Sequence, residues 1–436
     1  MESVNSRKIA LNLLNEIESS ASYSNIKINN AIREYKLVGQ DKNFVLKLVY
    51  GVLENKILLD YYIRKMSKTR LKKIDQRILN VLRLSIFQIV FLDKVPESAA
   101  VNEGVKLTKK INFKSTGFVN GILRNFIREK DNIKLPDRKK EKTLYYSVKY
   151  SYPEWLIERW LKTYDESFLE KLLIANNQAP ALTLRVNTLR ISRDGLLERL
   201  REEGLQVVKS ALVDEGIVVE DISSVRLDEL NSFKEGLFFV QDEGSMLVSN
   251  KLGVSPGMTI IDTCSAPGGK TTHIAQLMEN KGRIIAFDIH AHKMDKIAEN
   301  AKRLGVDIIE ARQQDAAIEE TSLINLADCV LVDAPCTGFG IIRRKPEIKY
   351  NRLEEDIDTL TTLQYSILNT SSAYVKLGGV LLYSTCSIDE AEDEAIIRKF
   401  LKEHPEFVLE EDGMQKLYPH IDGTDGFFIA KMKRIN

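Results

Sequence analysis

Apolar residues recur three and four positions apart through most of the first 130 residues, a spacing that places them on one face of an α-helix. The pattern covers residues 6–19, 43–66, 75–93, 98–110 and 116–130. A charged, proline-containing stretch then follows and is typical of a linker. We therefore expect an all-helical domain over residues 1–135.

A mixed pattern occupies the next hundred residues. Helical spacing is found at residues 151–177 and 193–204, and short alternating segments lie at 182–190, 204–210 and 216–220. Alternation of apolar and polar residues is typical of half-buried strands. The combination predicts a small α+β module over residues 136–238.

Nearly all-apolar segments alternate with helical stretches in the remainder of the chain. These segments are residues 258–264, 283–289, 306–315, 328–335 and 378–386. Strands of this composition are buried on both faces, and their alternation with helices is typical of a parallel, doubly wound sheet. The expected fold is therefore multidomain, with an α/β doubly wound, Rossmann-like domain over residues 239–436.

Composition supports a soluble, multidomain protein. The chain has 436 residues, of which 44% are hydrophobic and 29% charged, and this length exceeds that of one ordinary core. Polar residues interrupt the helical pattern near the N-terminus, unlike the apolar core of a signal peptide. The most apolar window, residues 78–92, contains an arginine that a membrane would not readily accept. We expect a cytoplasmic protein with no membrane partner.

Charge is distributed unevenly along the chain. Residues 1–130 contain 24 Lys and Arg against 12 Asp and Glu, a local net charge of +12, whereas residues 131–436 carry −11. A basic module of this kind suggests a polyanionic partner. The alternative is that these side chains only solvate helix faces.

The stretch DTCSAPGGKTT, residues 262–272, has the Gly-Lys-Thr end of a phosphate-binding loop. The first glycine of such a loop is missing, because Cys264 stands five positions before Gly269, and Pro267 has no N–H to donate. A dinucleotide loop with the pattern G-x-G-x-x-G is also absent. The loop therefore favours a nucleoside ligand without a polyphosphate.

Acidic residues follow the expected strands, at the edge of the sheet where doubly wound folds bind ligands. Asp288 lies about twenty residues after the glycines, the spacing at which a carboxylate binds a ribose diol. Asp315 would lie near an adenine edge, and the amides of Gly268 and Gly269 would face a small anionic group. S-adenosylmethionine is such a ligand. Each aspartate alone is also a common turn former.

The four cysteines are residues 264, 329, 336 and 386, and their spacing matches neither a disulfide framework nor a zinc site, so we expect no metal. Cys329 lies within an apolar strand and is expected to be a small buried residue. Cys336 and Cys386 follow strands expected to be neighbours, so both sulfurs could face one substrate.

Two thiols and Asp333 next to a methyl donor suggest a pyrimidine substrate. C5 of cytosine is too weak a nucleophile to accept a methyl group unaided, but a thiolate added to C6 makes C5 enamine-like. A carboxyl group at N3 stabilises the adduct, and a base must later remove the C5 proton. The spacing of Cys336 and Cys386 does not decide which of them attacks.

Four stretches together resemble the catalytic domain of the RNA cytosine-C5 methyltransferases of the NOL1/NOP2/Sun group. They are DTCSAPGGKTTHIAQ, AFDIHAHKMDKIAENAKRLG, LVDAPCTGFGIIRRKPEIK and LLYSTCSIDEAEDE. The basic helical part, with IDQRILNVLRLSIFQI and GFVNGILRNF, is similar to the NusB-like RNA-binding domain of the RsmB (Sun, Fmu) branch. The resemblance implies a class I methyltransferase domain and 16S ribosomal RNA as the substrate.

This resemblance also implies residue roles. Cys386 would attack C6, Cys336 would assist breakdown of the covalent adduct, and Asp333 would contact cytosine near the donor. Asp288 would bind the ribose of S-adenosylmethionine and Asp315 the adenine. The methionine part would lie against Cys264, Ser265, Ala266, Pro267, Gly268, Gly269 and Lys270. Relatives usually carry Arg at the position of Lys293, so that residue is left out of the expected site.

Basic residues follow the Pro-Cys motif. Arg343, Arg344 and Lys345 are expected to contact RNA phosphates, although a solvated basic turn would have the same composition. The target base must be unstacked for a thiolate to reach C6. We expect a monomer that acts on small-subunit ribosomal RNA. The alternatives are an RNA-binding regulator with an inactive methyltransferase domain and, less well matched, a P-loop ATPase.

Overall fold

A computed structural model describes residues 5–20, 24–221 and 226–436. The chain forms two compact units. The first consists of Met1–Asn177 together with Arg344–Arg352, and the second of Gln178–Arg343 together with Leu353–Asn436. The chain therefore leaves the second unit shortly after the Pro-Cys motif and returns to it nine residues later. The three-domain division remains a prediction.

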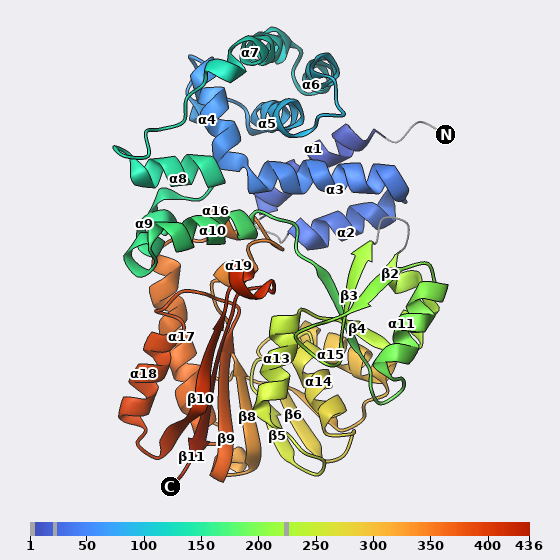
Figure 1. The fold of residues 1–436 in the computed structure, drawn as a ribbon, viewed down its shortest axis with the longest axis vertical. Helices are drawn as coiled ribbons and strands as arrows, with labels where there is room; N and C mark the ends of the chain where they lie inside the picture. The colour runs from blue at the N-terminus through green and yellow to red at the C-terminus, as the bar shows by residue number, and fades with distance from the viewer. Residues whose placement is uncertain (1–4, 21–23, 222–225) are drawn as a thin grey trace. The chain divides into compact units, whose positions relative to one another are not determined.

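The first unit is helical (Figure 1). Its helices are α1 (Ser6–Ser20), α2 (Ser24–Glu34), α3 (Gly39–Glu54), α4 (Lys56–Met66), α5 (Gln76–Phe91), α6 (Glu97–Ile111), α7 (Thr116–Glu129), α8 (Lys142–Tyr150), α9 (Glu154–Thr163), α10 (Glu166–Asn176) and α16 (Ile348–Asn351). The five predicted helical stretches are confirmed, with the stretch 43–66 divided between α3 and α4; residues 1–4 of the expected helical domain lie outside the described residues.

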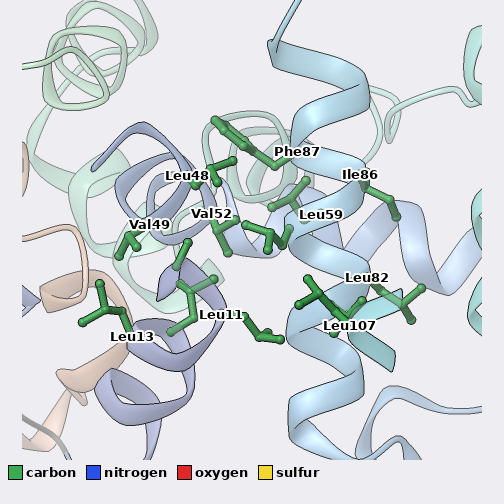
Figure 2. Packing of buried hydrophobic residues seen from close by; sticks show 14 of the residues in the cluster. Leu11, Leu13, Leu48, Val49, Val52, Leu59, Leu82, Ile86, Phe87 and Leu107 are labelled. Carbon is green, nitrogen blue, oxygen red and sulfur yellow. The ribbon is translucent and has the colours of Figure 1, made fainter. Parts of the chain in front are cut away.

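One hydrophobic core holds α1 to α7 together, and Figure 2 shows part of it. Leu48, Val52 and Leu82 are at most 2% exposed in this core. Gly51 of α3 permits the close approach of α5, since a Cβ atom there would lie 1.9 Å from Cζ of Phe87. The spacing of apolar residues along each helix therefore does predict the buried faces.

The second unit contains a four-stranded antiparallel sheet with the order β2-β3-β1-β4. Its elements are β1 (Leu182–Val186), α11 (Arg193–Glu202), β2 (Gln206–Lys209), β3 (Gly216–Asp221), α12 (Asn231–Lys234) and β4 (Phe238–Val240). The strands and α11 lie in the segments predicted for the small α+β module, whereas the predicted helical segment 151–177 forms α9 and α10 and belongs to the first unit. β4 pairs with β1, so the strand at the expected start of the catalytic domain belongs to the smaller sheet.

A seven-stranded sheet with the order β10-β11-β9-β8-β5-β6-β7 forms the rest of the second unit. Its elements are α13 (Glu243–Leu252), β5 (Thr259–Asp262), α14 (Gly269–Leu277), β6 (Arg283–Asp288), α15 (Ala291–Leu304), β7 (Ile309–Gln313), β8 (Ala327–Asp333), α17 (Glu355–Ser372), β9 (Val375–Thr385), α18 (Glu394–Glu403), β10 (Phe407–Leu417), α19 (Pro419–Asp422) and β11 (Phe427–Arg434).

This sheet is mixed, which corrects the expectation of a wholly parallel one. β5 to β9 pair in parallel, but β11 is antiparallel to both β9 and β10. The connection between β10 and β11 contains only the short α19, and so short a link joins antiparallel neighbours, because parallel strands need a longer crossover.

Helices cover both faces of this sheet, as a doubly wound fold requires (Figure 1). α13, α14 and α15 contribute Leu252, Ile274 and Leu304 to one buried cluster, and α17 and α18 contribute Leu368 and Phe400 to another. The order of connections reverses between β5 and β8, and ligands bind at such a switch point. Among the described residues, no helix has the length and apolar character needed to span a bilayer.

Candidate functional site

A tight loop joins the end of β5 to α14. Gly268, the residue before the helix, has a φ of +94°, and a Cβ atom there would lie 3.3 Å from Cα of Ile297. Glycine suits this backbone conformation and this close approach. Ser265 N and Oγ both bond to the carbonyl oxygen of Phe287, at 2.8 and 2.7 Å, which fixes the loop to β6.

The loop forms one wall of a cavity of about 230 Å³. The cavity is lined by Phe239, Val240, Gln241, Asp242, Ser245, Asp262, Cys264, Ser265, Ala266, Pro267, Gly269, Lys270 and Asp333. Most of the residues expected to bind a methionine moiety therefore lie around one space. The segment 239–245 was not expected there; its only sequence signal is that it precedes the first strand of the large sheet.

Asp262 is a site residue that the sequence analysis did not single out. Its side chain is fully buried, and Oδ2 accepts a hydrogen bond from Thr271 Oγ1 at 2.7 Å. Within the described part of the chain, its other oxygen has no hydrogen-bond partner. Burial raises the pKa of Asp262 to about 7, and the nearby charge of Asp333 acts in the same direction. A buried oxygen without a partner at the cavity wall suits a ligand that donates a hydrogen bond.

A buried arginine from the small sheet supports the loop. Arg185 of β1 is 1% exposed and donates hydrogen bonds to the Gly269 carbonyl at 2.6 Å and to Thr272 Oγ1 at 3.0 Å. It also donates to the side chain of Gln241, which lines the cavity. The small antiparallel sheet therefore takes part in shaping the ligand loop.

Lys270 connects the glycine loop to the end of β8. Its Nζ donates to Asp333 Oδ2 at 2.8 Å, and Ser384 Oγ donates to Asp333 Oδ1, also at 2.8 Å. Burial opposes the lysine charge, but the Asp333 carboxylate outweighs this effect and raises the pKa of Lys270. The ammonium group is therefore charged, and it also lies close to Cys386.

Asp288 and Asp315 do not line the cavity. Asp288 is 8% exposed, accepts a hydrogen bond from His290 N and forms an ion pair of 3.4 Å with Lys293. Asp315 accepts a hydrogen bond from Ala317 N at 2.9 Å, as a turn-forming aspartate does. Both residues follow strands on the β6 and β7 side of the loop. Their ligand contacts remain predictions.

The two expected catalytic cysteines lie together. Cys336 Sγ is 3.3 Å from Cys386 Sγ, and both side chains are partly exposed. β8 and β9 are parallel neighbours in which Asp333 pairs with Ser384, so the residues just beyond the two strands converge. A hydrogen bond of 2.9 Å from Gly340 N to the Cys386 carbonyl holds the two loops in register.

The neighbourhood of Cys336 disfavours its ionised form. Its hydrogen bond with Cys386, its burial and the nearby charge of Glu392 raise the pKa of the Cys336 thiol. Burial, followed by the charges of Asp262, Asp333 and Asp288, raises the pKa of Cys264 as well. The raised pKa disfavours the Cys264 thiolate, and the residue forms part of the cavity wall.

The three basic residues after the Pro-Cys motif differ in their environments. Arg343 is 8% exposed and donates to Asp425 Oδ1 at 2.6 Å and to the Gly423 carbonyl at 3.0 Å. A guanidinium group held by a buried carboxylate is poorly suited to the expected phosphate contact. Arg344 and Lys345 are partly buried and belong to the segment in the first unit.

No group of three or more His, Cys, Asp and Glu side chains in the described ranges is arranged to hold a metal ion. Two buried carboxylates, those of Glu392 and Asp393, lie next to the loops that carry the two cysteines. Glu392 and Asp393 are both 0% exposed. They belong to the stretch that follows the second cysteine motif, but composition alone offered no reason to assign them a role.

A doubly wound sheet with a glycine loop and a cavity at its switch point defines a Rossmann-like ligand-binding domain. Family models match three parts of the chain. Residues 250–433 match the 16S rRNA methyltransferase RsmB/F model, residues 4–128 the NusB family, and residues 152–226 the ferredoxin-like domain of RsmF/B-like methyltransferases.

Full-length relatives agree with these matches. The probable ribosomal RNA small subunit methyltransferase B of Bacillus subtilis (strain 168) is 38% identical over 455 residues, with both chains fully covered. The crystal structure of PH0851 is 29% identical, covers 99% of both chains and has a TM-score of 0.84. NSun6 from Pyrococcus horikoshii, solved with SFG, is 26% identical over 68% of this chain and 98% of its own, with a TM-score of 0.57. The chain belongs to the 16S rRNA methyltransferase RsmB/F family.

Proposed function

We propose that the protein transfers a methyl group from S-adenosylmethionine to C5 of a cytosine in small-subunit ribosomal RNA through a covalent cysteine adduct. The observation that carries this proposal is the pair of thiols, 3.3 Å apart, beyond two parallel strands, one of which ends in Asp333. Asp333 also lines the cavity next to the glycine loop. A pyrimidine with C6 near a sulfur and N3 near Asp333 would therefore lie beside the donor site.

The residues around the cavity fit S-adenosylmethionine. The unpartnered oxygen of Asp262 suits the ammonium group of its methionine part, and the Gly268 and Gly269 amides at the start of α14 suit the carboxylate. Asp288 and Asp315 would bind ribose and adenine. When bound, this cofactor supplies an electrophilic methyl group. The related NSun6 structure with SFG, an S-adenosylmethionine analogue, supports this choice.

Cys386 is the nucleophile in this proposal. The charged Lys270 ammonium lies close to Cys386, and reactive cysteines are commonly found near cationic groups. The thiolate forms a bond to C6, and the electron pair of the C5–C6 double bond becomes available at C5. Asp333, held by Lys270 and by Ser384, lies next to N3 and stabilises the adduct.

Cys336 acts in the second half of the reaction. Its hydrogen bond with the Cys386 thiol is the largest cause of its raised pKa. Bond formation between Cys386 and C6 removes the Cys386 thiol as the partner in that hydrogen bond. Once its own proton has passed to water, the Cys336 thiolate takes the C5 proton. The C5–H electron pair re-forms the C5–C6 double bond, the C6–S bond breaks, and Cys386 leaves as a thiolate.

RNA contacts are assigned by charge and position. We retain Arg344 and Lys345 as phosphate contacts, whereas Arg343 has a structural role because its guanidinium group is paired with buried Asp425. The basic helical unit, which matches the NusB family, would bind further along the RNA.

The test is transfer of a labelled methyl group from S-adenosylmethionine to deproteinised small-subunit rRNA from cells that lack the enzyme. Digestion to nucleosides should place the label in 5-methylcytidine, and Cys386→Ala should give none. Label in another nucleoside would contradict the cytosine-C5 assignment. RNA binding without transfer, to naked rRNA and to assembling subunits alike, would favour an RNA-binding regulator instead.

A further inference from the structure

One buried carboxylate joins the loops of the two cysteines. Glu392 is 0% exposed and accepts hydrogen bonds from Thr337 N at 2.8 Å and from Ser387 Oγ at 2.5 Å. It also accepts a hydrogen bond from the Thr337 hydroxyl. Since Thr337 follows Cys336 and Ser387 follows Cys386, this one side chain connects the backbones that carry both thiols.

A second side chain extends the connection to the other side of Cys336. Gln364 of α17 donates from Nε2 to Glu392 at 3.0 Å and to the Pro335 carbonyl at 2.9 Å. Pro335 and Thr337 are the residues directly before and after Cys336 in the sequence. The residues on both sides of this cysteine are therefore held by Gln364 and Glu392.

The carboxylate of Asp393, the next residue, binds the loop that carries Cys386. Asp393, also 0% exposed, accepts a hydrogen bond from Thr385 Oγ1 at 2.6 Å. Thr385 precedes Cys386, while Ser387, which follows it, bonds to Glu392. Two consecutive acidic residues thus bind the residues on both sides of Cys386.

Two thiols that act on adjacent atoms of one ring require a well-defined separation. A displacement of about 1 Å is enough to impair a catalytic group of this kind. Thr337 and Ser387 are each 0% exposed, whereas Cys336 and Cys386, the residues that precede them, remain partly exposed. The structure thus buries the attachment points, whereas the two cysteine residues remain partly exposed.

We propose that Glu392 is a positioning residue that sets the separation of Cys336 and Cys386 through Thr337 and Ser387. The effect of Glu392 on catalysis rests on the proposed function, whereas its effect on the separation of the two thiols does not. The first test is therefore independent of methyl transfer. It measures how fast the thiol oxidant diamide joins the two cysteines in the folded protein.

In this reaction the two thiols lose two protons and two electrons, one S–S bond forms, and the azo group of diamide is reduced to a hydrazine. Sulfurs 3.3 Å apart need to move only to about 2.05 Å. Peptide mapping by mass spectrometry distinguishes this disulfide from those of Cys264 and Cys329. Wild type should form it rapidly, and Glu392→Ala should form it about tenfold more slowly.

The variants are chosen to separate positioning from loss of folding. Glu392→Gln keeps the size of the side chain but has one acceptor oxygen, so its effect should be smaller than that of Glu392→Ala. Thr337→Val and Ser387→Ala each remove one hydroxyl group, and their effects should not add to that of Glu392→Gln. Glu390→Gln, at an exposed position where the carboxylate pairs with Arg398, is the control.

Binding of S-adenosylhomocysteine reports whether the cofactor cavity is intact, because Glu392 does not line it. We expect unchanged affinity in Glu392→Gln, a lower kcat and a slower formation of the covalent RNA adduct. A folded Glu392→Ala or Glu392→Gln that forms the disulfide as fast as wild type would overturn the proposal. The wild-type protein could transfer no methyl group while the Glu392 variants still form the disulfide more slowly than wild type. That result would support the positioning role and contradict only the proposed function.

Discussion

Lys270 Nζ donates a hydrogen bond of 2.8 Å to Asp333 Oδ2, joining the start of α14 to the end of β8. In the sequence, Lys270 belongs to a Gly-Lys-Thr motif and to the loop expected to lie against the methionine part of S-adenosylmethionine. The structure places the ammonium group against a carboxylate and near Cys386. The glycine loop and the cysteine pair are therefore parts of one electrostatic arrangement.

This ion pair predicts that Lys270→Met lowers kcat for methyl transfer by roughly 100-fold, because Asp333 and the Cys386 thiolate both lose a positive neighbour. The measurement is the single-turnover rate with saturating S-adenosylmethionine. Lys281→Met, which removes an exposed lysine paired with Glu279, is the control and should leave the rate unchanged. A wild-type rate in Lys270→Met would contradict the electrostatic role.

Alanine variants of the two cysteines should lose methyl transfer at different steps. Cys336→Ala should accumulate a protein–RNA adduct that survives denaturing gels, because the C5 proton is no longer removed. Cys386→Ala should form no adduct, since no bond to C6 is made. Labelled RNA and denaturing electrophoresis provide the measurement, and the double variant is the control. The reverse pattern would exchange the two assignments.

Asp262 predicts a pH dependence of stability. Its pKa is about 7 in the folded protein and about 3.9 in an unfolded chain. Below pH 4 both states are protonated. Between pH 4 and 7 only the unfolded state loses the proton, so the free energy of unfolding falls, by up to about 4 kcal/mol above pH 7.

Asp262→Asn should abolish this decline and make the protein more stable than wild type at pH 8, because asparagine still accepts the Thr271 hydrogen bond. Urea unfolding at a series of pH values measures the effect. Asp295→Asn, at an exposed position of α15, is the control and should keep the wild-type profile. Parallel curves for Asp262→Asn and wild type would show that this carboxyl group does not titrate in that range.

The buried pair of Arg343 and Asp425 should matter for stability and little for RNA. Arg343→Met leaves a carboxylate that is 1% exposed without its cation, which should lower the free energy of unfolding by about 3–5 kcal/mol. Arg343→Met combined with Asp425→Leu should recover most of this loss.

The matched control is Arg398→Met, whose exposed pair with Glu390 should contribute less than about 1 kcal/mol. Binding of rRNA fragments at several salt concentrations tests the expected phosphate contact. The Arg343→Met/Asp425→Leu variant should keep the wild-type salt dependence. If the RNA affinity of this variant depended less steeply on salt than that of wild type, Arg343 would be shown to contact an RNA phosphate.

The fold was largely predictable because its elements follow local patterns. Most helices of the first unit and the strands that end at Asp262, Asp288 and Asp333 lie where apolar periodicity placed them, whereas α2 and α8 were not predicted. The antiparallel end of the large sheet was not predicted, since an apolar strand has the same composition in either direction. Its direction depends on which neighbour it pairs with.

The candidate site was predictable where its residues follow strands directly. Cys336 and Cys386 could be expected to meet because parallel strands end at one edge of a sheet. Arg185, Gln364 and Glu392 could not be identified in this way. Each contacts the site from another part of the chain, and a buried polar residue has no signal in sequence until its partner is known.

The sequence by itself determined the elements, the family resemblance and the residue types at the strand ends, because periodicity and short motifs act over a few neighbouring positions. Only the tertiary structure decided which charges are paired. Arg343 and Asp425 are 82 positions apart, and Glu392 and Thr337 are 55 apart. Hydrogen bonds of this range form only when the fold has brought both partners together and excluded water from them.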